Sequence, residues 1–167
     1  QHKAIHSFPT RRSSDLGQLV DAAKELNMDS LAITDHGNMF GAVEFYKAAK
    51  ENGIKPIIGC EVYVAPRSRL DKVHGIDNER FHLVLLCKNN TGYENLIKIV
   101  SESWVTGFYT KPRIDKQLLE KYHEGLIALS ACLAGEIPRK LLQDDYDGAK
   151  EAALWYDKTF GRGNYYL

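Results

Sequence analysis

The sequence predicts an α/β fold in which apolar strands alternate with amphipathic helices. Runs such as Arg80–Lys88 (RFHLVLLCK) are apolar almost throughout, which is typical of strands buried on both faces of a parallel sheet. Helical segments such as Met39–Asn52 separate these runs and place apolar residues at helical spacing. We therefore expect an α/β barrel or a doubly wound parallel sheet, covered by helices on both faces.

The expected elements follow one another in a regular order. Strands are predicted over Ser30–Thr34, Lys55–Ala65, Arg80–Lys88, Gly125–Ser130 and Asn164–Leu167. Helices are predicted over Gly17–Met28, Met39–Asn52, Asn90–Val100, Asp115–Tyr122, Gly135–Leu142 and Tyr146–Phe160. Gly53 is the expected C-cap of the second helix. Because the last predicted strand runs to Leu167, we expect the closing strands of the fold to lie beyond it.

Composition limits the class of protein. A chain of 167 residues fits one domain. The 22 Lys and Arg residues balance the 22 Asp and Glu residues, so the composition does not indicate an extended basic surface for binding nucleic acid. No apolar run approaches a membrane span, and no signal peptide is present, so we expect no membrane partner. The three cysteines lack zinc-finger or CxxC spacing, which suits a reduced, cytoplasmic chain.

Polar residues with metal-binding side chains stand at the ends of these strands or interrupt them. The stretch LAITDHGNMFGAVEFYKAAKE (Leu31–Glu51) passes from an apolar run into Asp35-His36, Glu61 interrupts another apolar run, His82 opens the next, and Cys132 follows the fourth. Imidazole, carboxylate and thiolate bind zinc-like and manganese-like cations. In a parallel barrel such groups gather at one rim, which favours a shared metal site.

Each of these residues also has a plainer interpretation. Asp35 and His36 could form a turn and cap the next helix. Glu61 could face solvent, His82 could be a hydrogen-bonded core imidazole, and Cys132 could be a small buried hydrophobe. The remaining histidines and cysteines need no role beyond loop solvation or packing, namely His74, His123, Cys60 and Cys87.

Five segments carry a resemblance to a known family: Ser30–Pro66, FHLVLLCKNNTGYENLIKIVS (Phe81–Ser101), GFYTKPRID (Gly107–Asp115), EGLIALSACLAGEIPRKLL (Glu124–Leu142) and ALWYDKTFG (Ala153–Gly161). They resemble the PHP (polymerase and histidinol phosphatase) domain of bacterial replicative DNA polymerase III alpha subunits. TDHG alone would fit any PHP protein. The segments NNTGYENLIKIVS and GFYTKPRID are specific to the polymerase branch.

The resemblance implies an incomplete, distorted (β/α)7 TIM-like barrel of the PHP type, with divalent metal ions, zinc or manganese, at its rim. The ligands that it implies are His36, Glu61, His82 and Cys132, with Asp35 as an outer support of His36. It implies part of a DNA-directed DNA polymerase, with either a metal-dependent phosphoesterase or 3′–5′ exonuclease site, or a structural module that stabilises the polymerase and docks a proofreading exonuclease. DNA and the other replicase subunits are the implied partners of the parent protein.

The beginning of the sequence departs from the family. Ala4 stands where the family has the first histidine of a His-x-His-Ser pattern, although His6-Ser7 matches its second half. HSFPTRRSSDL (His6–Leu16) instead resembles the conceptual translation of a common sequencing adapter. We therefore predict that residues 1–16 are not native and that the PHP domain occupies residues 17–167. The alternative is a divergent loop in which Arg11 and Arg12 contact phosphate.

These departures lead to a prediction about activity. The family's last ligand pair, an Asp-x-His, is expected beyond Leu167. Of the family's first two histidines, one is replaced by Ala4, and the other matches His6, in the segment predicted to be non-native. The chain is thus expected to keep only the middle of the site. We expect it to bind metal weakly and to hydrolyse little, and the polymerase active site is not expected within it.

Overall fold

The computed structural model describes residues 13–167, and side chains from residue 16 onward. The chain divides into two compact units. The first comprises the residues up to Leu31 together with Val43–Pro56, and the second comprises Ala32–Ala42 and Ile57–Leu167. The candidate site residues all belong to the second unit.

The described elements alternate much as the sequence predicts. The helices are α1 (Ser13–Glu25), α2 (Ala42–Glu51), α3 (Asn90–Val105), α4 (Lys116–Tyr122), α5 (Glu136–Leu142) and α6 (Tyr146–Phe160). The strands are β1 (Ser30–His36), β2 (Lys55–Val64), β3 (Phe81–Cys87), β4 (Arg113–Ile114), β5 (Leu126–Leu129) and β6 (Tyr165–Tyr166). Among the described residues no helix has the length and apolar character needed to cross a membrane.

Most element boundaries differ from the prediction by a few residues, and three of these differences bear on the site or its support. Helix α1 starts before Gly17 and ends before Met28, because Asn27 adopts a left-handed backbone conformation (φ 56°) that stops the helix. Strand β1 continues through His36 instead of ending at Thr34. Helix α3 continues past Val100 to Val105, and its N-cap is Asn89, whose side chain accepts a hydrogen bond from the Gly92 backbone.

The sheet lies mainly in the second unit, and its direction corrects the prediction. The strand order is β1-β2-β3-β5-β6, with β4 beside β2. Strands β2 and β4 pair in parallel, as do β5 and β6, but β3 is antiparallel to both β2 and β5. The expectation of a wholly parallel sheet is therefore wrong. No helix lies between β2 and β3, so their connection does not make the crossover that parallel neighbours require.

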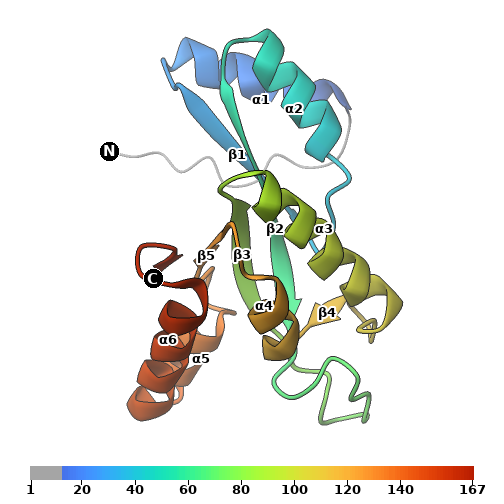
Figure 1. Cartoon of the computed structure of the whole chain (residues 1–167), viewed down its shortest axis with the longest axis vertical. Helices are drawn as coiled ribbons and strands as arrows, with labels where there is room; N and C mark the ends of the chain where they lie inside the picture. The colour runs from blue at the N-terminus through green and yellow to red at the C-terminus, as the bar shows by residue number, and fades with distance from the viewer. Residues whose placement is uncertain (1–12) are drawn as a thin grey trace. The chain divides into compact units, whose positions relative to one another are not determined.

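One face of this sheet carries the hydrophobic core. Alternate residues of β2, β3 and β5 are buried together, namely Cys60, Val62, Val64, Leu83, Leu85, Leu126 and Ala128. Helices α3 and α6 pack on these strands, α4 packs on α3, and α5 lies beside α6 (Figure 1). Of the residues between them, Glu61, His82 and Val84 are only partly buried, whereas Tyr63 is buried. Within the described residues, full cover on both faces is thus not observed. The strand alternation instead turns Glu61 and His82 away from the core.

Candidate metal centre

The carboxylate of Glu61 lies at the centre of the four predicted ligands. Its Oε1 atom is 2.9 Å from Nδ1 of His36 and 3.0 Å from Nδ1 of His82. The Sγ atom of Cys132 is 3.5 Å from the same His82 nitrogen. Four residues from distant parts of the sequence are therefore brought into one continuous set of contacts.

Strand register explains the meeting of Glu61 and His82. In the antiparallel β2–β3 pair, His82 stands opposite Tyr63, and Glu61 stands opposite Val84. Residues two apart on a strand share a face, so the Glu61 and His82 side chains lie diagonally on the same face. The rings of Tyr63 and His82 also meet edge to face, with centroids 5.2 Å apart. This contact restrains the imidazole from its flank.

The loop after β5 brings Cys132 to His82. The Ala134 carbonyl accepts a 3.0 Å hydrogen bond from the His82 backbone, and the Gly135 backbone donates one of 2.8 Å to the Cys132 carbonyl. Ala131 has a positive φ of 65°, a conformation that is costly for a residue with a side chain. The loop is thus a tight turn that presents an exposed thiol.

A turn fixed by Gly37 follows His36. Gly37 has a φ of 69°, and a Cβ atom added there would lie 2.9 Å from both Pro112 Cγ and Tyr63 Cε2. Its nitrogen donates to the Glu61 carbonyl at 2.8 Å, and its carbonyl accepts from the Trp104 indole at 2.8 Å. The backbone around His36 is therefore held on several sides, although the imidazole itself is 73% exposed.

Asp35 makes the contacts of a turn residue. Its carboxylate accepts a 3.0 Å hydrogen bond from the Gly41 backbone, just before α2. Its carbonyl accepts from the Cys60 thiol at 3.3 Å. These bonds correspond to the plainer interpretation of Asp35 as a residue of the turn before the helix. Support of His36 by Asp35 remains a prediction.

The electrostatics of the cluster favour a neutral imidazole at His82. Burial lowers the pKa of His82 below its ordinary value, while the charge of Glu61 acts in the opposite direction. The cations Arg80 and Arg139 reinforce the lowering. A histidine must be deprotonated to bind a metal ion, so this environment suits a ligand.

The four side chains are of the kinds that bind a divalent cation, but their present arrangement is not that of a metal site. Two imidazoles, a carboxylate and a thiol are all zinc ligands, and Glu61 is only 14% exposed. Both imidazole Nδ1 atoms are, however, within hydrogen-bonding distance of the same carboxylate oxygen. Over residues 13–167 no group of three or more such side chains is arranged to hold a metal ion as it stands. A bound ion would have to replace the protons that the two imidazoles share with the Glu61 carboxylate.

The remaining histidines and cysteines lie outside this cluster. His74 is exposed in the connection between β2 and β3, and His123 contacts the Glu120 carbonyl at the end of α4. Cys60 belongs to the core, and burial raises its pKa to about 12. Burial likewise raises the pKa of Cys87 to about 11. Their contacts agree with loop and packing roles.

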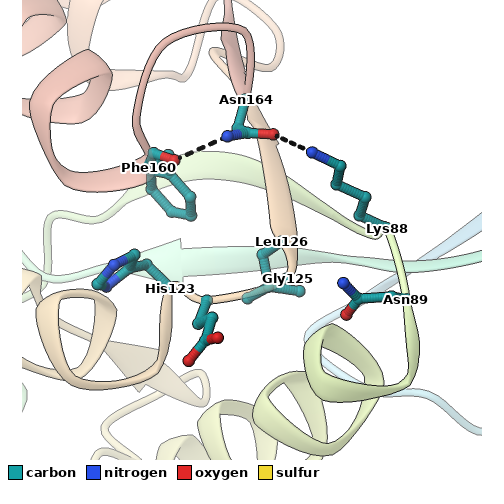
Figure 2. A pocket seen from close by; sticks show the side chains of 8 residues that line it. Lys88, Asn89, His123, Gly125, Leu126, Phe160 and Asn164 are labelled. Atoms are coloured by element: carbon teal, nitrogen blue, oxygen red, sulfur yellow. Dashed lines mark hydrogen bonds between the residues drawn. The ribbon is translucent and has the colours of Figure 1, made fainter.

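A pocket of about 250 Å³ lies at the opposite end of the strands from the cluster. It opens beside Lys88, which follows β3, and Gly125, which precedes β5, whereas His82 is the second residue of β3 and Cys132 follows β5. Figure 2 shows Asn164 bonded on both sides: its Oδ1 accepts from Lys88 Nζ at 3.1 Å, and its Nδ2 donates to the Phe160 carbonyl at 3.0 Å. None of the predicted ligands lines it.

Sequence reasoning did not single out several residues that surround the cluster. Tyr63 packs against His82, Trp104 holds the turn after His36, and Arg80 lies over the Tyr63 ring. The position of Arg80, two residues before His82, is a local signal that could have been noticed. Nothing in the sequence near Trp104 indicates its contact with Gly37, because the two residues are far apart along the chain.

Imidazole, carboxylate and thiol side chains thus meet in this mixed α/β unit, and these are the donor types that bind zinc-like cations. The family model described as "PHP domain" matches residues 6–167, and the chain belongs to this family. The predicted non-native segment, residues 1–16, falls largely outside the described residues; only Ser13–Leu16 are described, as the start of α1.

The relatives specify the branch of the family. DNA polymerase III subunit alpha of Treponema pallidum is 50% identical over 93% of this chain and 13% of its own length. The subunits of Borreliella burgdorferi and Thermus aquaticus are 49% and 55% identical over 92% and 83% of this chain. The chain is thus homologous to the PHP region of these subunits and spans about an eighth of their length. Among solved structures, an amidohydrolase from Chromobacterium violaceum matches 52% of this chain and 28% of its own at 26% identity, with a TM-score of only 0.34.

Proposed function

We propose that this chain is the PHP region of a DNA polymerase III alpha subunit and carries part of the parent protein's metal-dependent phosphoesterase or 3′–5′ exonuclease site, which is incomplete here. His36, Glu61, His82 and Cys132 would hold zinc or manganese. In this proposal, polymerisation, the DNA substrate, the other replicase subunits and a cytoplasmic location belong to the whole parent protein. The single observation that carries the site is the position of Glu61 Oε1 between the two imidazoles.

Charge supports a cation at this position. A largely buried carboxylate is costly unless a positive group offsets it. Around Glu61 the nearest side-chain partners are two imidazoles, and burial keeps one of them, His82, from protonating readily. When bound, a divalent cation would supply an activated water and shield the charge on phosphate oxygens. The four side chains would hold and orient it.

Zinc titration of the 167-residue chain by calorimetry tests the proposal. We expect binding in the micromolar range or weaker, in keeping with the predicted loss of family ligands. Glu61→Gln and Cys132→Ala should each weaken it at least about tenfold, because each removes one donor. Glu120→Gln, on the exposed side of α4, is the matched control. Equal affinities in all variants would refute the site, and submicromolar binding would contradict its expected incompleteness.

A structural role is the second candidate function. The membership of the PHP family supports it equally, since the resemblance to the polymerase branch also implies a module that stabilises the polymerase and docks a proofreading exonuclease. The same titration separates the two candidates. A folded chain without measurable zinc or manganese binding would favour the docking module.

A further inference from the structure

Two positively charged side chains gather around the Tyr63 ring beside the cluster. The guanidinium carbon of Arg80 is 5.8 Å from the ring centroid, and the ammonium nitrogen of Lys111 is 5.9 Å from it. The same ring meets the His82 imidazole edge to face. The Tyr63 ring therefore contacts both cations and also His82, one of the candidate metal ligands.

Arg80 has unused hydrogen-bonding capacity. A guanidinium has five N–H donors, and the one bond that this group makes within residues 13–167 is from Nη1 to the Asn78 carbonyl, at 3.1 Å. Its Nε atom is buried without an acceptor. Because Nε is covered, an incoming anion would reach this guanidinium through Nη1 and Nη2, of which Nη2 makes no hydrogen bond within residues 13–167.

The contrast with neighbouring arginines is informative. Arg67, Arg69 and Arg139 each pair with a carboxylate, from Asp77, Asp115 and Glu79 respectively. Arg80 has no carboxylate partner among the described residues. A cation without such a partner, beside a group of metal-binding side chains, is suited to a mobile anion rather than to a structural ion pair.

Backbone geometry presents Lys111 to the Tyr63 ring. Thr110 adopts a positive φ of 59°, and the Tyr109 nitrogen donates to the Lys111 carbonyl at 3.0 Å, which closes a tight turn. The next residue, Pro112, packs against the Gly37 turn that follows His36. Lys111 is exposed, so its ammonium group is available to a ligand.

We infer that Arg80 and Lys111 form the phosphate-binding part of this site, receiving the phosphate group of the ester that the proposed metal centre would hydrolyse. The inference rests on the proposed function and adds to it the residues that select the substrate. Arg80 supplies directional N–H donors and Lys111 a point charge. Tyr63 holds both cations near its ring and contacts His82.

Binding measured without metal tests this role separately from the metal site. The 167-residue chain is titrated in EDTA with inorganic phosphate and, separately, with the oligonucleotide (dT)8, by calorimetry. Arg80→Gln should weaken binding about tenfold, because charge-assisted hydrogen bonds are lost. Arg80→Lys should lose less, and Lys111→Gln a few-fold. If Arg80→Gln weakens the binding of inorganic phosphate alone, the ligand is a phosphomonoester. If it weakens the binding of (dT)8 alone, the ligand is a phosphodiester. Either result supports the inference.

Controls make the outcome decisive. Arg162→Gln changes an exposed arginine that precedes β6, at the far end of the sheet, and should bind both probes as the unchanged chain does. Urea titration verifies that each variant is folded. Unchanged binding of both probes by Arg80→Gln overturns the inference, and so does an equal loss in Arg162→Gln. If Arg80→Gln lowers the affinity for the probes while zinc titration shows no metal site, the proposed function is refuted but the assignment of phosphate binding remains.

Discussion

The indole Nε1 of Trp104 donates a 2.8 Å hydrogen bond to the carbonyl of Gly37, the residue that follows His36. Trp104 belongs to α3, and its ring also stacks on Phe108, with centroids 5.5 Å apart. The helix that packs on the sheet thereby restrains the turn that carries one candidate ligand. This link between core and cluster has a measurable consequence.

Trp104→Phe should loosen the His36 turn while keeping an aromatic ring in place. We expect zinc affinity to fall a few-fold and the free energy of unfolding to fall by about 1 kcal/mol, the usual contribution of one hydrogen bond. Calorimetry and urea unfolding measure the two effects. Trp155→Phe, which alters a tryptophan outside the cluster, should leave zinc affinity unchanged. Equal affinities in both variants would show that the bond does not position His36.

Gly37→Ala should destabilise the second unit. The alanine Cβ would meet Pro112 and Tyr63 at 2.9 Å, and the positive φ of 69° disfavours any side chain. Backbone strain of this kind costs about 1–3 kcal/mol, and urea unfolding measures it. Gly53→Ala has a similar φ of 73° but nothing within 4 Å, so its loss should be smaller. A loss no larger than that of Gly53→Ala would mean that the close approach is relieved by movement of the neighbours.

Thiol alkylation at pH 8 should modify Cys132 selectively. Cys132 is exposed, whereas burial raises the pKa of Cys60 to about 12 and that of Cys87 to about 11. The buried thiols are then almost fully protonated, and only the thiolate reacts quickly. Mass spectrometry after iodoacetamide treatment should show one rapid addition, absent in Cys132→Ser. Zinc should slow this addition if Cys132 binds the ion, and an unchanged rate at saturating zinc would exclude it as a ligand.

Stability should decline at alkaline pH partly through Cys60. Because burial raises its folded-state pKa to about 12, the folded chain retains a proton that the unfolded chain releases near pH 9. The unfolded state therefore binds fewer protons between these values, and the free energy of unfolding falls as pH rises. Cys60→Ala should be less stable at pH 7 because of the cavity, but its decline above pH 9 should be shallower. Parallel declines for both proteins would contradict this contribution.

Arg113→Met should release the connection between β2 and β3. The buried Arg113 guanidinium donates to the carbonyls of Asp77, Arg69 and Asp71 at 2.7–3.0 Å. Without these donors the carbonyls lose their partners, and we expect a loss of about 3 kcal/mol or more. Limited trypsin digestion should then cut the 67–80 segment sooner. Arg162→Gln, which changes an exposed arginine outside this connection, should digest as the unchanged chain does, and an equal rate for Arg113→Met would refute the anchoring role.

Sequence alone determined the local elements and the candidate ligands. The apolar runs of β2, β3 and β5 and the helical spacing of α4 and α6 are properties of neighbouring residues, so their existence was predictable. The short strand β4 was missed because two residues carry no periodic signal. His36, Glu61, His82 and Cys132 could be predicted as ligands because strand ends and the PHP resemblance both mark single positions.

Tertiary structure decided what depends on register and packing. The antiparallel direction of β3 follows from the path of the connection after β2, which apolar content does not encode. The grouping of Arg80 and Lys111 around Tyr63 likewise depends on contacts between distant segments. Arg80 directly precedes β3, Lys111 lies in a turn, and Tyr63 belongs to β2. Periodicity reports which face of an element is buried, whereas contacts between distant segments depend on how those faces are aligned in space.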